Sequence, residues 1–200
     1  MNQKFENLSL SDQSHIKSVL ILKKESKAKK RKVACIVGIP SEDNSTGVIL
    51  CTGINHMFAE AFDGNCEDSK GETIPYVVHA EEQAIFRFNR HNEYYYSRIK
   101  KENKVISDVT LYVTYSPCIG CCKAIAMSGI KRIVFVDKHS SNFDNTPYAP
   151  QDFLNQMGIK FIHTTVPLSI RRGLENENQD KLDDTNFVKA SGDFKHITNK

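Results

Sequence analysis

Three of the six cysteines in this 200-residue chain lie close together, at Cys118, Cys121 and Cys122. The first two form a CxxC pair, and the residues from Cys118 to Ser128 have the pattern of a helix. At the start of a helix, residues i and i+3 project from one face and the helix dipole favours thiolates, so both sulfurs can hold one metal ion. Cys122 lies one step further round the helix, and we expect it to be a small core residue.

A two-cysteine site needs more ligands, and His79 is the best candidate because it begins a second expected helix, residues 79–90. Two cysteines and one histidine leave a fourth tetrahedral position open, as in a catalytic zinc site. A CxxC pair alone can also be a redox pair or half of a structural site, and a lone histidine is more often an ordinary hydrogen-bonded residue. Here Glu81 follows His79 by two residues and Pro117 precedes Cys118, which favours the metal site.

These two segments, HAE from His79 and PCIGC from Pro117, match the H-x-E…P-C-x-x-C signature of zinc-dependent nucleoside and nucleotide deaminases. Within this superfamily, residues 15–165 resemble the deoxycytidylate (dCMP) deaminases most closely. Three stretches carry the resemblance, LYVTYSPCIGCCKAIAMSGIKRIVF, KRKVACIVG and CTGINHMF. The chain departs from that family at Ala34, Ile54 and His56, where glycine, tyrosine and glycine are common.

The resemblance implies an enzyme, a hydrolase that converts dCMP to dUMP with release of ammonia and so supplies dUMP for thymidylate synthesis. It implies one catalytic Zn²⁺ per chain, held by His79, Cys118 and Cys121, which activates water for attack on C4 of cytosine. Glu81 would carry the proton of that water to N3 and then to the leaving amine.

The basic run from Lys23 to Lys32 holds seven Lys or Arg among ten residues. It can be a solvated helix end or a nuclear import signal, but it leads directly into an expected strand, so part of it must be ordered. We expect Lys30 and Arg31 to bind the 5′-phosphate through charge-assisted hydrogen bonds. Further substrate-binding candidates are Asn55, Ala80 and Tyr115. Asn55 could instead be a turn residue and Tyr115 a core residue.

The regulation and assembly of the similar family give further expectations. Many of its members respond to dCTP and dTTP at a subunit boundary, and the resemblance places an effector or interface contact at Arg90. The alternative for Arg90 is a solvated arginine favoured by the helix dipole. A homo-oligomer, such as the family's hexamers, is expected. A second, structural zinc is not expected, since the segment before His79 offers only His56 and Cys66.

Composition limits the classes of function. The net charge of +3 is too small to indicate a nucleic-acid partner, and no run is apolar enough to span a bilayer. The start, MNQKFENLSL, lacks the pattern of a secretion signal. We therefore expect a cytoplasmic protein with reduced cysteines, no membrane partner and a small-molecule substrate.

Strand and helix patterns alternate along the chain. Strands are expected at residues 32–38, 47–53, 109–114, 132–137 and 159–165, and a long functional loop at 55–78. Helices are expected after a cap at Ser11 and at residues 79–90, 118–128 and 152–157. The alternation predicts an α/β fold with a mixed sheet. With the resemblance, this is a three-layer cytidine-deaminase-like fold with a mixed five-stranded sheet flanked by helices. The expected divisions are an N-terminal segment (1–14), the deaminase domain (15–165) and a polar C-terminal tail (166–200).

Three alternatives stay open. The chain could deaminate a free nucleoside if the basic run is only a solvated face. It could deaminate a base within RNA or single-stranded DNA, with Tyr94, Tyr95 and Tyr96 stacking on bases, although its basic charge is one short cluster. It could also be a non-catalytic zinc-binding module, which would have no need for Glu81.

Overall fold

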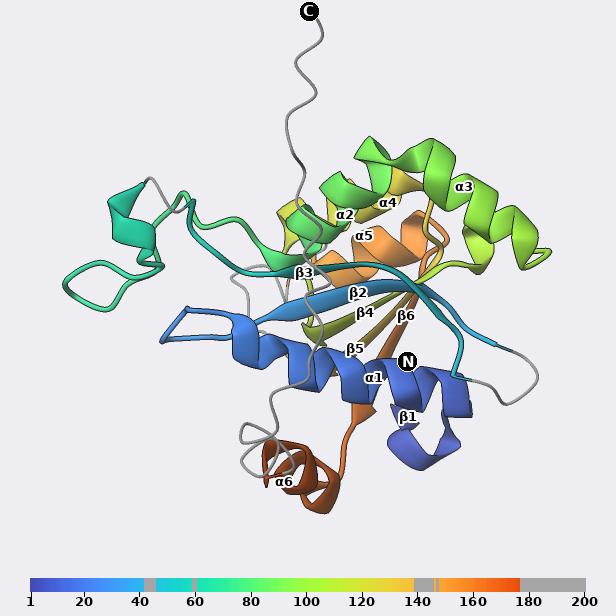
Figure 1. The fold of residues 1–200 in the computed structure, drawn as a ribbon, viewed down its shortest axis with the longest axis horizontal. Coiled ribbons are helices and arrows are strands. Elements are labelled where there is room, and N and C mark those ends of the chain that lie inside the picture. The colour runs from blue at the N-terminus through green and yellow to red at the C-terminus, as the bar shows by residue number, and fades with distance from the viewer. Residues whose placement is uncertain (42–45, 59–60, 139–145, 147, 177–200) are drawn as a thin grey trace, which may run out of the picture.

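A computed structural model describes residues 1–41, 46–58, 61–138, 146 and 148–176 of the chain. At its centre is a mixed six-stranded sheet with helices on both faces (Figure 1). The strand order is β1-β6-β5-β4-β2-β3, with β2 antiparallel to both of its neighbours and the other pairs parallel. The strands are β1 Asn2–Lys4, β2 Ala34–Ile39, β3 Val48–Ile54, β4 Thr110–Tyr115, β5 Arg132–Asp137 and β6 Lys160–Thr165.

The predicted α/β class with a mixed sheet is confirmed, but the predicted count of five strands is wrong. The sixth strand is β1, which pairs parallel with β6, Asn2 lying opposite His163. Its sequence, NQK, is too short and polar to show an alternating pattern. Pairing with the edge of β6, rather than local preference, therefore makes this segment a strand.

Helices cover the two faces of the sheet unequally. Helices α2 to α5 lie on one face, and α1 and α6 lie on the other (Figure 1). Their bounds are α1 Leu10–Leu22, α2 Ala80–Arg90, α3 Asn92–Lys101, α4 Ile119–Ser128, α5 Pro150–Gln156 and α6 Leu168–Asn176. Four 3₁₀ turns occur at Phe5–Asn7, Lys23–Glu25, Phe62–Gly64 and Ile106–Asp108. The three layers place one core on each side of the sheet.

Side chains alternate between these two cores along the central strands. In β4, Leu111 and Val113 pack under α2 and α4, whereas Tyr112 packs under α1. Both sets are fully buried, as expected for a central strand covered on both faces. The sheet is therefore a rigid platform for the loops at its edge.

Two helix predictions need correction. The cap of α1 is Ser9, whose Oγ accepts the N–H of Asp12 over 3.0 Å, and not Ser11, whose hydroxyl donates to the Thr46 carbonyl instead. Helix α3 was not predicted, because its sequence is largely exposed and Ile99 is its one fully buried residue.

The C-terminal part of the described chain is a helix that docks on the rest of the fold. Helix α6 packs against α1, and Arg171 pairs with Asp137 at the end of β5 over 2.8 Å. Lys24 also donates to the Leu174 carbonyl over 2.6 Å. Of the expected tail (166–200), residues 177–200 lie outside the described residues, and the domain boundaries stay a prediction. None of the described helices is long and apolar enough to cross a membrane.

Candidate active site

Two helices begin side by side at the same end of the sheet. His79 is the N-cap of α2, and Cys118 is the N-cap of α4, to which β4 leads through Ser116 and Pro117. The first N–H groups of a helix have no partner within the helix and carry a partial positive charge. The chain thus brings its two chemical motifs together at a place that favours anions.

His79, Cys118 and Cys121 form a compact cluster. The sulfur of Cys118 lies 3.6 Å from the sulfur of Cys121 and 3.6 Å from His79 Nδ1, and Cys121 Sγ lies 3.4 Å from the same nitrogen. Zinc–sulfur and zinc–nitrogen bonds of ordinary length, at tetrahedral angles, would separate such atoms by about 3.6–3.8 Å. The three residues therefore fit a zinc ion. Among the described residues, no other group of three or more His, Cys, Asp or Glu side chains lies close enough together to hold a metal ion.

Contacts within the cluster shift its pKa values. The contact with Cys121, together with the His79 ring, lowers the pKa of Cys118 to about 3. The contact with Cys118 raises the pKa of His79 to about 9, and that contact together with burial raises the pKa of Cys121. The cluster thus contains a thiolate at neutral pH, which is an anionic soft donor that suits Zn²⁺.

Cys122 is not part of this cluster. It is fully buried, and its sulfur contacts the Pro117 carbonyl at 3.7 Å. The prediction that it is a core residue is confirmed.

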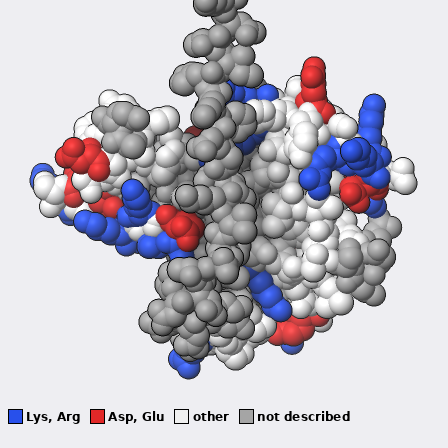
Figure 2. Space-filling model, in the orientation of Figure 1, with Lys and Arg blue, Asp and Glu red and all other residues white. Residues whose placement is uncertain are grey.

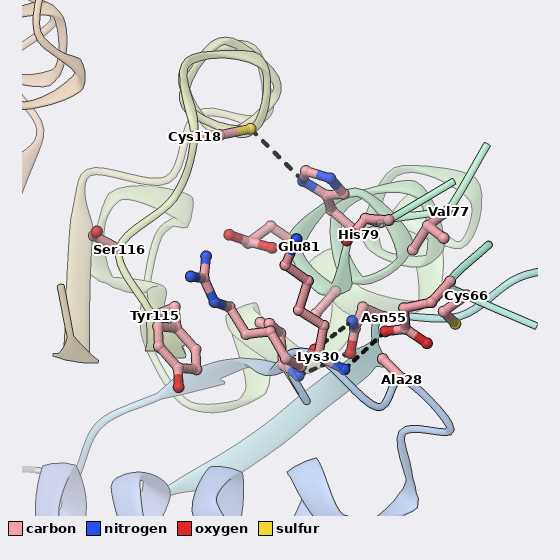
Figure 3. Close-up of a pocket in the computed structure, with 15 residues that line it drawn as sticks. Ala28, Lys30, Asn55, Cys66, Val77, His79, Glu81, Tyr115, Ser116 and Cys118 are labelled. Carbon is pink, nitrogen blue, oxygen red and sulfur yellow. Dashed lines mark hydrogen bonds between the residues drawn. The ribbon is translucent and has the colours of Figure 1, made fainter. Parts of the chain in front are cut away.

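Two neighbouring glutamates at the start of α2 have different surroundings. Glu82 is exposed and accepts the backbone N–H of His79 over 3.0 Å, which closes the N-terminus of the helix. Glu81 is 4% exposed and points into the space between Cys118 and Tyr115 (Figure 3). Burial raises the pKa of Glu81 to about 7. Glu81 is therefore the carboxylate that can exchange protons beside the cluster.

The start of α2 is held by β3. A Cβ atom on Gly53 would lie 2.1 Å from the Ala80 carbonyl oxygen, so only glycine allows this approach. Gln83 Oε1 accepts the N–H of Ile54 over 2.9 Å, and Gln83 Nε2 contacts the ring of His56. These contacts fix the distance from the end of β3 to the cluster.

A pocket of about 360 Å³ opens beside the cluster. Cys118 and His79 lie at one side of it, and Lys30, Asn55 and Tyr115 at the opposite side (Figure 3). The residues that line it are Ala28, Lys30, Arg31, Val33, Asn55, Cys66, Glu67, Thr73, Val77, His79, Ala80, Glu81, Tyr115, Ser116 and Cys118. Every predicted substrate-binding residue is therefore in the lining, whereas Cys121 is buried and is not part of it.

The profile of the cytidine and deoxycytidylate deaminase zinc-binding region matches residues 10–137, which is more than half of the chain. The chain belongs to this deaminase family. The match includes His79, Glu81 and the CxxC pair, so the resemblance stated from the sequence is confirmed.

Particular relatives support the same assignment. The chain is 35% identical over 74 residues to the deoxycytidylate deaminase of Enterobacteria phage T4, covering 37% of this chain and 36% of that protein. It is 29% identical over 135 residues to the deoxycytidylate deaminase of Homo sapiens, covering 64% of each. The matches therefore span less than two thirds of either relative.

A solved structure is similar over a larger share of its length. The crystal structure of dCMP deaminase from the cyanophage S-TIM5, in complex with dCMP and dUMP, matches with a TM-score of 0.57 and 26% identity. The match covers 75% of this chain and 93% of that chain. The three-layer fold expected of the deaminase family is thus confirmed.

In this member of the deaminase family, the side chain of Asn55 makes three hydrogen bonds within the chain itself. Its Nδ2 donates to the Arg31 carbonyl over 2.8 Å, and its Oδ1 accepts from Val33 N over 2.8 Å and from Ser26 Oγ over 2.6 Å. Asn55 therefore organises the basic loop that borders the pocket. Its predicted contact with substrate stays a prediction.

The two predicted phosphate ligands differ in their surroundings. The ammonium of Lys30 bonds the Glu72 carboxylate over 2.5 Å, so this cation already has an anionic partner. The guanidinium of Arg31 lies over the Tyr115 ring, with Cζ 5.2 Å from the ring centre. Such stacking holds an arginine in place. The N–H groups point outward in the plane of the guanidinium, so they remain available to bond a phosphate. Arg31 is thus the better placed of the two.

Other predicted contacts lie away from the pocket. Arg90 is the last residue of α2 and is exposed, and it is not among the residues of the lining. On α3, Tyr95 stacks on Phe88 with ring centres 5.7 Å apart, while Tyr94 and Tyr96 are exposed. The three tyrosines do not border the pocket and so form no platform beside the candidate zinc site.

Sequence reasoning missed Ser26, Glu67 and Glu72, which hold the basic loop. Each lies 29 to 42 residues along the chain from its partner and carries no local pattern, so no signal could have found them. The close approach at Gly53 did have a signal, because a glycine inside a strand often marks a tight backbone contact.

Proposed function

We propose that this chain is a zinc-dependent enzyme that hydrolyses dCMP to dUMP and ammonia. The observation that carries the proposal is the position of Glu81. Its buried carboxylate faces a pocket with the His–Cys–Cys cluster on one side and Arg31 of the basic loop in the same lining. A nucleotide in this pocket can place its base at the cluster and its phosphate at the loop.

The relatives favour this substrate. The proteins from phage T4 and Homo sapiens are deoxycytidylate deaminases, and the S-TIM5 enzyme was crystallised with dCMP and dUMP. These two nucleotides are the substrate and product of the proposed reaction. Supply of dUMP for thymidylate synthesis follows as the role that we propose for the product.

The residues of this chain divide the chemistry among them. His79, Cys118 and Cys121 would hold one Zn²⁺, which supplies Lewis-acid activation of water. Glu81 takes a proton from the attacking water and delivers it to N3 of cytosine. Glu81 then takes the proton of the new hydroxyl group on C4 and delivers it to the exocyclic amine, so that the C4 carbonyl forms, the bond from C4 to nitrogen breaks and ammonia leaves.

Substrate position depends on both ends of the pocket. Ala80 is the first residue of α2, so its backbone N–H has no partner within the helix and can donate to the base carbonyl. Arg31 can offer two N–H groups to the 5′-phosphate, supported from below by Tyr115. Asn55 acts by fixing the backbone of this loop, and a direct contact with the sugar is a further part of the proposal.

Regulation and assembly are also proposed. We expect dCTP to activate and dTTP to inhibit, with Arg90 at an effector or subunit contact, and we expect a homo-oligomer. Saturation curves for dCMP with each triphosphate, and sedimentation of the purified protein, test these two points. A hyperbolic curve that neither triphosphate moves would remove the regulatory proposal and leave catalysis intact.

A substrate panel tests the proposed function. Cytidine, deoxycytidine, CMP, dCMP, dCTP and short single-stranded oligonucleotides are each incubated with zinc-loaded protein, and uracil product and ammonia are measured. We expect dCMP to be turned over most efficiently. Faster turnover of an oligonucleotide would favour a nucleic-acid deaminase, and bound zinc without any product would favour a non-catalytic module.

A further inference from the structure

The basic loop beside the pocket is bonded to two acids that come from a distant part of the chain. The backbone N–H groups of Lys29 and Lys30 both donate to Glu67 Oε1, each over 2.9 Å. The ammonium of Lys30 bonds Glu72 Oε2. Consecutive N–H groups aimed at one oxygen form a concavity that binds anions, and here a carboxylate of the same chain fills it.

The two acids are held in place by a small hairpin. Glu67 and Thr73 form an isolated antiparallel bridge. Within the turn, Asp68 Oδ1 accepts the N–H groups of Lys70 and Glu72, each over 2.9 Å. This turn brings Glu67 and Glu72 to the basic loop. Acidic and basic side chains lie next to one another on the left-hand lobe of the molecule in Figure 2.

Glu67 and Arg31 lie in the same pocket lining, and among the described residues Arg31 has no acidic partner. Within the described part of the chain, ion pairs join Lys30 to Glu72, Arg132 to Asp12 and Arg171 to Asp137, and none involves Arg31. The phosphate end of the pocket thus offers one uncommitted guanidinium, next to donors that are already used.

We propose that Glu67 and Glu72 are specificity-determining residues that limit the pocket to nucleoside monophosphates. This inference rests on the proposed function. A single phosphate can pair with Arg31, but a second phosphate would need more donors, and the nearest ones are bonded to the two acids. Its added charge would also lie close to two carboxylates, where repulsion is only partly screened.

Charge-neutral variants test this inference. Glu67→Gln and Glu72→Gln keep the size of the side chain and an oxygen that accepts hydrogen bonds, and Glu72 is 70% exposed, so its variant keeps the fold. Dissociation constants and kcat/KM are measured for dCMP and dCDP at low and at high salt. The control is Glu93→Gln on α3, which makes the same charge change outside the pocket lining.

The expected result is a change in selectivity. The wild-type protein should prefer dCMP over dCDP by about a hundredfold, and each variant should reduce this preference by about tenfold, mainly through tighter binding of dCDP. High salt should shrink the difference, and Glu93→Gln should leave it unchanged.

Other outcomes would overturn the inference. If the two acids only hold the loop, both nucleotides will bind more weakly and the preference will not change. Equal binding of dCMP and dCDP to the wild-type protein would also contradict it, as would no binding of either. If dCMP binds with the expected preference but no ammonia is released, the proposed function fails and the selectivity stands.

Discussion

The side-chain amide of Asn55 donates to the backbone carbonyl of Arg31 over 2.8 Å. The same amide accepts hydrogen bonds from Val33 and Ser26, on the two sides of Arg31 along the chain. Residues at the end of β3 therefore fix the path of the basic loop before any ligand arrives. The proposed phosphate contact is made by Arg31. Asn55 fixes the backbone of Arg31, and the Tyr115 ring lies under its guanidinium.

Asn55→Ala should lower both stability and activity. It removes three hydrogen bonds at a residue that is 8% exposed, so the free energy of unfolding should fall by about 2–4 kcal/mol. The efficiency of dCMP turnover should also fall, because Arg31 loses its support. Urea unfolding and kcat/KM for dCMP measure the two effects.

A matched control is Asn65→Ala, which removes one exposed bond to the Phe62 carbonyl. It should change stability by no more than about 0.5 kcal/mol. Equal effects of the two variants would show that Asn55 does not organise the loop.

The zinc ligands can be tested by metal content. Purified protein should hold about one zinc ion per chain, and His79→Ala, Cys118→Ala and Cys121→Ala should each lose it. Cys122→Ala should keep it, because that sulfur is buried against Pro117. Zinc is measured by mass spectrometry after dialysis, and full retention in Cys118→Ala would overturn the assignment.

Periodicity and motif spacing predicted the parts of the molecule that depend on local sequence. Regular helix geometry predicted that Cys118 and Cys121 share one face, whereas the H-x-E…P-C-x-x-C signature was needed to add His79, which only the tertiary fold brings to them. The bonds from Asn55 to Arg31 and from Glu72 to Lys30 could not be predicted, because each joins residues that only the tertiary fold brings together. Strand β1 was missed for the same reason.

Two neighbouring glutamates should differ sharply in their effect on catalysis. Glu81→Gln should keep zinc and the fold but lose turnover by about 10²–10⁴-fold, since an amide cannot carry protons. Glu82→Gln should be mild, because Glu82 is exposed and a glutamine can still accept the N–H of His79. Steady-state kinetics with dCMP, together with zinc content, compare them, and comparable losses would mean that the wrong carboxylate was assigned.

A buried ion pair on the opposite face of the sheet should make stability depend on pH. Asp12 accepts two bonds of 2.7 Å from Arg132 and one of 2.6 Å from the Tyr112 hydroxyl. Burial acts to raise the pKa of Asp12, but these bonds outweigh burial and hold that pKa below its ordinary value. The pair therefore contributes stability above the pKa of the unfolded chain, and this is lost as the pH falls through the folded pKa.

Asp12→Asn isolates this contribution. At pH 7 it should lower the free energy of unfolding by about 2–3 kcal/mol, since Arg132 is left without its charged partner but remains partly exposed. The difference from wild type should narrow as the pH falls through the folded pKa of Asp12, which lies below the ordinary value, because Asp12 in the wild-type chain then also becomes neutral. Urea unfolding over a pH series measures it, with the exposed Asp152→Asn as control. A difference that stays constant with pH would contradict the account.

Recognition of the 5′-phosphate by Arg31 is the central claim, and kcat/KM for dCMP and for deoxycytidine tests it most directly. Two charge-assisted hydrogen bonds of about 1.5–3 kcal/mol each favour dCMP by on the order of a hundredfold or more. Arg31→Ala should remove most of this preference while barely changing the weak turnover of deoxycytidine. Lys32→Ala is the control, since Lys32 bonds the Lys24 carbonyl and is not part of the lining. Equal turnover of dCMP and deoxycytidine by the wild-type protein would contradict the account.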